Sequence, residues 1–546
     1  MDLGRDNHKF IYKTTLCRRT ALGILRTGVG GERMGGSDRR LRRRLATAAA
    51  LAMLIAGHAH GQPNTSQSTP PRKTLHLPGG KAADISGPVK PDWDSIRAHY
   101  TVPEWFRDAK FGIFIHWGLY SVPAAQSEWY PRYMYRTPAT IARHTERFGA
   151  PDKFGYKDFI PRFKAEKYDP AAWADLFERA GAKYVVPVAE HHDGFAMYDS
   201  RLTRWDAKDM GPKRDLLSEL MVETRKRGLK FGVSNHRIEN WDFMYPGAGV
   251  KTDLFDPKYA DFYGPPQPPQ PREQMTSAEI MAGVGAPQSA AFREEWLART
   301  YEQIDKFKPD LLWFDNGINP RGLDPTKLRL AAYYYNRARE WGKPVTLTTK
   351  RDAFLAGTIK DYERQWQAPF SLQQEPYQVD DALGDKWGYV EGMGNLSAQT
   401  VLFRLIENVS RNGNLLLNVS PMADGTIPEA QVKVLLEVGE WLKLNGEAIY
   451  GTRAWKQDND HIVRFTRKGN ILYAILLAWP EEPLMISAVP QNIGKATKVS
   501  LLGSGAALAF KQNDAGLTVT LPARPAGARY AYVLRLEGLK LDQAGH

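Results

Sequence analysis

Short apolar runs alternate with amphipathic stretches from near residue 105 to near residue 350, and this rhythm limits the possible folds more than any other feature. The runs have the length of buried strands, and the stretches between them have the length of helices. Repeated strand–helix units predict a parallel sheet, and over so long a segment we expect an α/β fold of the (β/α)8-like TIM barrel type rather than an open doubly wound sheet. We expect strands at residues 111–118, 183–188, 229–236, 311–315 and 344–349, and helices at residues 171–182, 216–227, 294–307 and 328–341.

Beyond about residue 453 the pattern changes to short β-type runs separated by turns, at residues 462–466, 471–477, 517–521 and 530–536. This pattern predicts a C-terminal antiparallel β-sandwich. The sandwich is expected to brace the barrel, with sugar binding as the alternative. We therefore divide the chain into an N-terminal extension with a signal peptide, a flexible leader, a catalytic barrel and the sandwich, at residues 1–61, 62–92, 93–453 and 454–546.

The N-terminal region has the pattern of a secretory signal. An arginine-rich stretch at residues 39–44 precedes an apolar run at 45–56, and small residues follow it, including Gly57 and Ala59. The run is too short for a stable membrane anchor. A start at Met34 would leave a signal of ordinary length. We therefore expect a periplasmic or secreted protein, cleaved between about residues 57 and 62, with no membrane anchor.

The net charge of +13 comes largely from this N-terminal region. Residues 1–60 carry +8, which leaves +5 for the remaining chain. Residues 61–546 contain no Lys/Arg cluster interleaved with aromatic residues, so we expect no nucleic-acid partner. The single cysteine, Cys17, lies in the same region, so the mature protein is expected to have no disulfide and no thiolate site. Glycine-rich nucleotide-binding motifs are also absent.

Polar residues end four successive predicted strands, and in a parallel barrel these ends meet at one face. They are His116 with Trp117, then the pair His191 and His192, then His236, and finally Asp315. Adjacent His191 and His192 would point to opposite sides of a regular strand, and residues 61–546 contain no HExxH or His-x-His motif. Both observations disfavour a metal-dependent hydrolase. A sugar site fits these residues better.

In such a site the histidines and Glu128 would hydrogen-bond hydroxyl groups. The aromatic rings of Trp117, Trp129 and Phe195 would cover the apolar faces of a sugar ring. A long insertion at residues 245–290 forms either a wall of the pocket or a surface excursion.

Hydrolysis of a glycoside requires two carboxyl groups, one as nucleophile or base and one as acid. Asp315 follows a buried strand and precedes an Asn-Gly turn, so it is the predicted nucleophile. The acid should come from a later strand, and Glu363 has a strand-like approach at residues 358–360. Glu375 and the pair Asp380 and Asp381 are its rivals.

The ordered motifs resemble those of the family 29 α-L-fucosidases, strongly over residues 95–460 and weakly over the tail. The matching segments are residues 110–118, 127–130, 191–195, 311–315, 412–421, 424–428 and 439–453. The resemblance implies an irregular (β/α) barrel followed by a β-sandwich, a retaining mechanism without a cofactor, and a fucosylated glycan as substrate. Two carboxyl groups ~5–5.5 Å apart are expected for such a mechanism.

The resemblance also implies roles for individual residues. Asp315 matches the nucleophile. Glu363 matches the acid/base of members with an Asp-Phe-Glu-Arg-Gly-like segment, although Gln365 replaces the glycine here. Lys350 matches a lysine of that subgroup and is expected to touch substrate. The positions expected to grip the fucose hydroxyls are His116, Glu128, Trp129, His191 and His192.

The third strand departs from the commoner tyrosine-containing version of the family. It ends in Ser234-Asn235-His236, and we expect His236 still to contact the sugar. Besides the exo-acting fucosidase, two alternatives are a catalytically inactive sugar-binding protein on the same scaffold and a metal-dependent hydrolase. The sequence does not reveal the linkage preference or the oligomeric state.

Overall fold

The computed structural model describes residues 87–264, 266–270, 287–524, 527 and 529–541. The predicted signal peptide and most of the predicted leader lie outside these residues. Among the described residues, no helix has the length and apolar character that crossing a membrane requires. At the end of the predicted leader, Val89 is buried, and its backbone exchanges hydrogen bonds of 3.0 and 2.9 Å with the Asn336 side chain.

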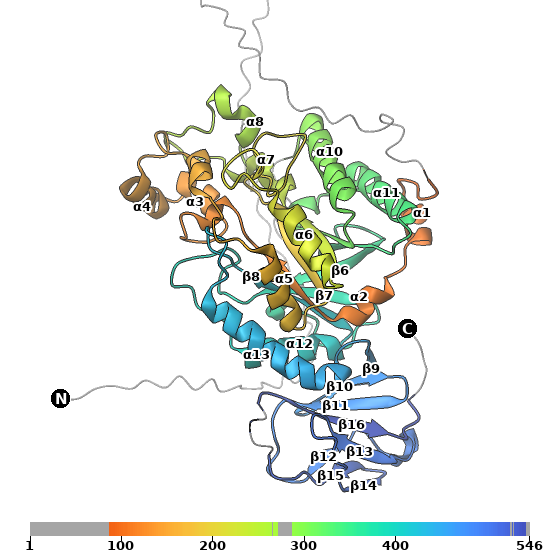
Figure 1. Ribbon diagram of the computed structural model, residues 1–546. Helices are drawn as coiled ribbons and strands as arrows, with labels where there is room; N and C mark the ends of the chain where they lie inside the picture. The colour runs from red at the N-terminus through yellow and green to blue at the C-terminus, as the bar shows by residue number, and fades with distance from the viewer. Residues whose placement is uncertain (1–86, 265, 271–286, 525–526, 528, 542–546) are drawn as a thin grey trace, which may run out of the picture. The chain divides into compact units, whose positions relative to one another are not determined.

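Eight parallel strands form a closed barrel in chain order, with β8 pairing back to β1 (Figure 1). The prediction of a (β/α)8-like barrel is therefore confirmed. The strands are β1 (Phe111–Ile115), β2 (Tyr184–Glu190), β3 (Lys230–Asn235), β4 (Leu311–Phe314), β5 (Thr346–Lys350), β6 (Thr358–Glu363), β7 (Tyr377–Ala382) and β8 (Gly413–Val419).

The strands are apolar because most of them are buried on both faces, as in other parallel sheets. Alternate side chains point into the barrel, where Phe114, Val186 and Trp313 belong to one cluster. The intervening side chains belong to the outer cluster beneath the helices. Gly112 is required by close packing, because a Cβ atom there would lie 2.4 Å from the ring of Tyr184.

Most strands are followed by a helix that packs on the outside of the barrel (Figure 1). These helices are α5 (Pro170–Arg179), α6 (Leu216–Lys226), α10 (Ala290–Phe307), α11 (Asp324–Glu340), α12 (Ala398–Ser410) and α13 (Glu429–Asn445). The sequence predicted the first four to within a few residues. The start of α5 is fixed by Asp169, whose side chain accepts hydrogen bonds from the backbone N–H groups of residues 171 and 172, with Pro170 in the first turn.

The barrel is irregular around β6. Residues 351–357 and 364–376, all of which the structure describes, contain no α-helix, only a 3-10 turn at Gln365–Gln367. Additional helices occur before β1 and in the loops after β1 and β3. They are α1 (Trp93–His99), α2 (Glu104–Ala109), α3 (Tyr130–Arg136), α4 (Pro138–Phe148), α7 (Asn240–Phe243) and α8 (Ala260–Tyr263).

The described part of the insertion at 245–290 is anchored to α3. Asp253 is buried and accepts hydrogen bonds from the hydroxyls of Tyr135 (2.9 Å) and Tyr263 (2.8 Å). Lys157 pairs with the same carboxylate at 3.1 Å. The segment therefore packs on the protein through a buried polar network.

Two antiparallel sheets follow the barrel, as predicted. One has five strands in the order β13-β16-β11-β10-β9, and the other has three in the order β12-β15-β14. The strands are β9 (Arg453–Asp460), β10 (Val463–Lys468), β11 (Ile471–Leu476), β12 (Leu484–Ile486), β13 (Lys498–Leu501), β14 (Phe510–Asn513), β15 (Gly516–Val519) and β16 (Tyr532–Glu537). Their apolar side chains form a separate core that includes Phe465 and Leu534.

Candidate active site

The carboxyl ends of the barrel strands surround a cavity of about 320 Å³. All nine residues predicted for the site line it, namely His116, Glu128, Trp129, His191, His192, His236, Asp315, Lys350 and Glu363. The strand topology explains why, because most of them end a strand or directly follow one. Of the described residues in the insertion at 245–290, none lines the cavity.

Asp315 directly follows β4, and both of its carboxylate oxygens are engaged. Oδ1 accepts a hydrogen bond from the backbone N–H of Asn316 at 2.8 Å, and Oδ2 accepts one from Nδ1 of His236 at 3.2 Å. Nε2 of His192 lies 3.7 Å from Oδ2. Burial raises the pKa of Asp315, but the bond from His236 and the positive charge of Lys350 outweigh it and hold the pKa well below its usual value. The carboxylate is therefore ionised at neutral pH.

His236 is held between Asp315 and Ser234. Its Nε2 lies 2.5 Å from the hydroxyl oxygen of Ser234. A carboxylate can only accept, so Nδ1 carries the proton that it shares with Asp315, and in the neutral ring Nε2 accepts from Ser234. Ser234 is buried within β3, so this chain of hydrogen bonds orients the imidazole toward Asp315.

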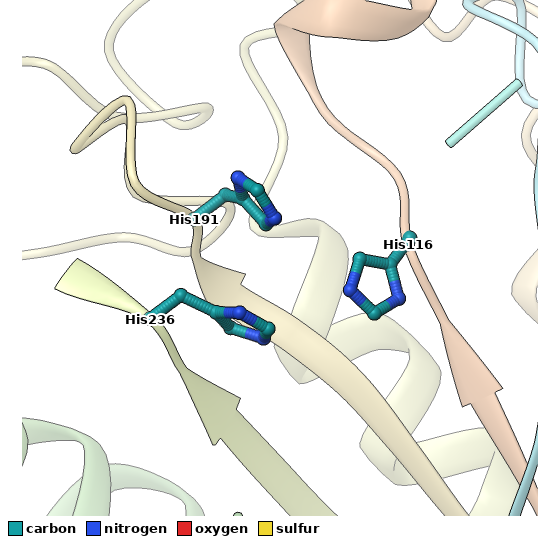
Figure 2. A group of neighbouring side chains, drawn as sticks. All are labelled: His116, His191 and His236. Carbon is teal, nitrogen blue, oxygen red and sulfur yellow. The ribbon is translucent and has the colours of Figure 1, made fainter. Parts of the chain in front are cut away.

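Three imidazoles from separate strand ends gather around one space (Figure 2). The ring centroids of His116, His191 and His236 lie 4.8 to 5.6 Å apart. Nδ1 of His116 is 2.8 Å from Oδ1 of Asn418. Burial lowers the pKa of both His116 and His191 well below the usual value, and neighbouring histidines add to the effect. Burial likewise lowers the pKa of His192, to about 3.

Neutral imidazoles each offer one donor and one acceptor, which suits the hydroxyl groups of a sugar. They also suit a metal ion, and ligand atoms of His116, His191 and His236 lie within 4.8 Å of one another. Treatment with a chelator separates the two uses, since only a metal-dependent enzyme would lose activity.

His191 and His192 both reach the cavity because β2 ends irregularly. The pairing of β2 with β3 shifts register between Val188 and Glu190, and a turn begins after Glu190. This break ends the regular alternation of side chains along β2. Both histidines can therefore face the same cavity although they are adjacent in sequence.

Lys350, Glu363 and Asp380 form a cluster of ionisable side chains on β5, β6 and β7. Nζ of Lys350 lies 2.5 Å from Asp380, 3.6 Å from Asp361 and 3.7 Å from Glu363. Burial lowers the pKa of Lys350, but these carboxylates outweigh it and hold the pKa above its usual value. Lys350 is therefore a buried cation beside a cavity carboxyl group, and the Glu363 side chain is 33% exposed.

The rival acids are less well placed than Glu363. Glu375 is exposed and precedes β7, so it lies at the opposite end of the barrel, away from the cavity. Asp381 is paired with Arg404 at 2.5 Å and with Arg364 at 3.5 Å, and it does not line the cavity. Asp380 does line it, but it is buried and bound to Lys350.

Two aromatic predictions were wrong. Trp117 and Phe195 are buried away from the cavity. Trp117 packs instead against Phe163, Tyr168 and Trp173, with ring centroids 5.0 to 5.2 Å apart. Because successive side chains at a strand end point in opposite directions, a tryptophan next to an inward-facing histidine turns toward the helices.

The cavity also contains residues that the sequence did not single out. Glu239, Tyr133, Trp313 and Trp387 line it. Burial raises the pKa of Glu239 well above its usual value, and the charge of Asp315 adds to the effect. Its carboxylate accepts a hydrogen bond from the N–H of Gly317 at 2.7 Å. Glu239 and Trp387 come from loops without periodicity; their only signal is an acid or an aromatic residue shortly after a strand end.

A closed parallel barrel with carboxyl groups, histidines and tryptophans in one polar cavity at its strand ends defines a barrel glycoside hydrolase. The Alpha-L-fucosidase family model matches residues 80–447, and the model of the Alpha-L-fucosidase C-terminal domain matches residues 456–537. The chain therefore belongs to the α-L-fucosidases, family 29 of the glycoside hydrolases, as the motifs predicted.

Individual relatives agree with this assignment. Tissue alpha-L-fucosidase of Bos taurus is 32% identical over 477 residues, which cover 82% of this chain and 91% of the bovine protein. Plasma alpha-L-fucosidase of Homo sapiens is 33% identical over 459 residues, which cover 79% and 88%. The crystal structure of Thermotoga maritima alpha-fucosidase in complex with a mechanism-based inhibitor is 32% identical, with a TM-score of 0.66, over 82% of this chain and 99% of that one.

Proposed function

We propose that this protein is an exo-acting α-L-fucosidase that removes terminal α-L-fucose from glycans with retention of configuration, using Asp315 as nucleophile and Glu363 as acid/base. The observation that carries the assignment is the carboxyl group of Asp315, which accepts a hydrogen bond from His236 and lies in the same cavity as the partly exposed Glu363. One carboxyl group thus has the environment of a nucleophile, and the other is open to solvent and leaving group.

The reaction has two displacements. In the first, a carboxylate oxygen of Asp315 attacks the anomeric carbon while Glu363 protonates the glycosidic oxygen, so the bond to the leaving group breaks and a fucosyl ester forms. In the second, Glu363 takes a proton from water, the water oxygen attacks the anomeric carbon, and Asp315 is released.

The remaining cavity residues are proposed to hold the sugar. His116, His191 and His192 are neutral at working pH and offer hydrogen bonds to hydroxyl groups. Glu128 is positioned by a hydrogen bond of 3.1 Å from the N–H of Gly388. Trp129 offers its ring to the apolar face of the sugar, including the methyl group of fucose.

Proton NMR of the fresh reaction with an aryl α-L-fucoside tests this function. A retaining enzyme releases α-L-fucose first, and the β-anomer appears only later by mutarotation. Initial release of the β-anomer would contradict the double displacement, and absence of hydrolysis would contradict the activity.

We further propose that the protein is exported. The support is the arginine-rich stretch and apolar run at residues 39–56. N-terminal sequencing of the exported protein should give a start between about residues 57 and 62. Protein that retains the uncleaved N-terminal segment would contradict the proposal.

A further inference from the structure

A second cavity, of about 380 Å³, adjoins the candidate active site. Ser127, Glu128, Tyr133 and Trp387 line both cavities. The volume falls in the range of about 300–1,000 Å³ that is typical of small-molecule sites. A sugar joined to the residue in the first cavity would therefore find space of its own next to it.

Arg364 lines the second cavity beside Trp387, which lines both cavities. It directly follows Glu363, and its guanidinium carbon lies 4.4 Å from the ring centroid of Trp387. The guanidinium also contacts the carbonyl groups of Gly384 at 3.4 Å and Asp385 at 3.5 Å, and the carboxylate of Asp381 at 3.5 Å. It has five N–H donors in a fixed plane, more than these contacts use, so it can still donate to a ligand.

The backbone of Arg364 adopts a conformation that side-chain-bearing residues avoid. Its φ is 63° and its ψ is 149°, close to a region occupied almost solely by glycine. The hydrogen bond from its backbone N–H to the carbonyl of Asp380, at 2.8 Å, holds it there. Backbone strain of this kind clusters at functional sites. In this conformation the guanidinium lies over the ring of Trp387 at the edge of the second cavity.

The remaining walls are polar and nearly neutral in charge. Gln126, Thr137 and Thr140 contribute amide and hydroxyl groups. The charged residues in these walls are two acids, Glu128 and Asp385, and two bases, Arg364 and Lys386, so their formal charges cancel. Such walls suit a neutral, hydroxyl-rich ligand better than an anionic one.

We propose that this second cavity binds the neutral sugar to which the fucose is attached, a hexose or N-acetylhexosamine, and that Arg364 is its principal hydrogen-bond donor. This inference rests on the proposed fucosidase function. Arg364 would thereby link recognition of the second sugar to Glu363, the residue that protonates the bond between the two sugars.

The test compares two kinds of substrate in Arg364→Gly, which tolerates the backbone conformation, and in Lys386→Ala, which also alters the lining of the second cavity. kcat/KM is measured for 4-nitrophenyl α-L-fucoside and for fucose linked to galactose or to N-acetylglucosamine. Arg364→Gly should lower the disaccharide-to-aryl ratio of kcat/KM roughly ten- to hundredfold, mainly through KM. Lys386→Ala should lower the ratio less, and Lys433→Ala, exposed on α13 and remote from both cavities, should not change it.

An equal loss on both substrate types would overturn the subsite, because Arg364 would then act only by positioning Glu363. An unchanged ratio would also overturn it. Both results leave the fucosidase function intact, whereas wild-type protein that hydrolyses neither substrate would overturn the proposed function and the subsite with it.

Discussion

The ionisation and the orientation of the Asp315 carboxylate depend on neighbouring groups. His236 donates to one oxygen and is itself held by Ser234, while the backbone of Asn316 binds the other oxygen. The sequence predicted Asp315 and His236 because each follows an apolar run. It did not predict that they bond to each other, because the distance between two strand ends depends on barrel geometry.

Ser234→Ala tests whether this chain of hydrogen bonds sets the pKa of Asp315. The folded pKa of Asp315 is held low, so weakening the bond from His236 should raise it. In the pH profile of kcat/KM, the acidic limb marks the pH below which Asp315 is protonated, and it should move to higher pH. At neutral pH, kcat/KM should fall about tenfold. Ser234→Thr keeps the hydroxyl and is the matched control. An unshifted acidic limb in Ser234→Ala would contradict the role of the serine.

Glu363→Ala tests the acid/base assignment. Fucosides with poor leaving groups should lose roughly 10²–10⁴-fold in rate, whereas activated aryl fucosides should lose far less in the first step. Azide should restore turnover by replacing water in the second step. Glu375→Ala is the control and should behave as wild type, because Glu375 lies at the other end of the barrel. If Glu375→Ala shows the selective loss instead, Glu363 is not the acid.

At the level of strands and helices, buried apolar runs were sufficient to predict most of the barrel. Runs at 111–118 and 311–315 correspond to β1 and β4, and four of the helices between strands, α5, α6, α10 and α11, were also predicted. Loops were less predictable because their paths depend on tertiary contacts. Glu239 and Trp387 enter the cavity from such loops. The position of Trp117 at a strand end did not reveal which way its side chain points, so the prediction that it lines the cavity was wrong.

Gly112→Ala tests the packing of β1 against β2. A Cβ atom would lie 2.4 Å from the Tyr184 ring inside the barrel, so the substitution should destabilise the protein by about 1–3 kcal/mol. Urea unfolding followed by fluorescence measures the change. Gly322→Ala is the control, because a Cβ atom at Gly322 meets nothing within 4 Å. Equal urea midpoints for the two variants would show that the barrel accommodates the added methyl group without loss of stability.

At the scale of the whole molecule, the barrel and the C-terminal sheets are connected by specific bonds. The indole N–H of Trp441 on α13 donates to the carbonyl of Ala531 at 2.8 Å, and Arg464 on β10 binds Glu407 on α12 at 2.8 Å. Among the residues that the structure describes, those that line the cavity all precede these sheets. This arrangement is consistent with the prediction that the C-terminal domain braces the barrel.

The central claim is that Asp315 forms a covalent bond to fucose. Incubation with a 2-fluoro-fucosyl fluoride, followed by proteolysis and mass spectrometry, tests it most directly, because the fluorine slows release of the sugar. We predict a single fluorofucosyl adduct on the peptide that contains Asp315, lost in Asp315→Ala. An adduct on Glu363, Asp380 or Glu239, or rapid turnover with no adduct on Asp315, would contradict the account.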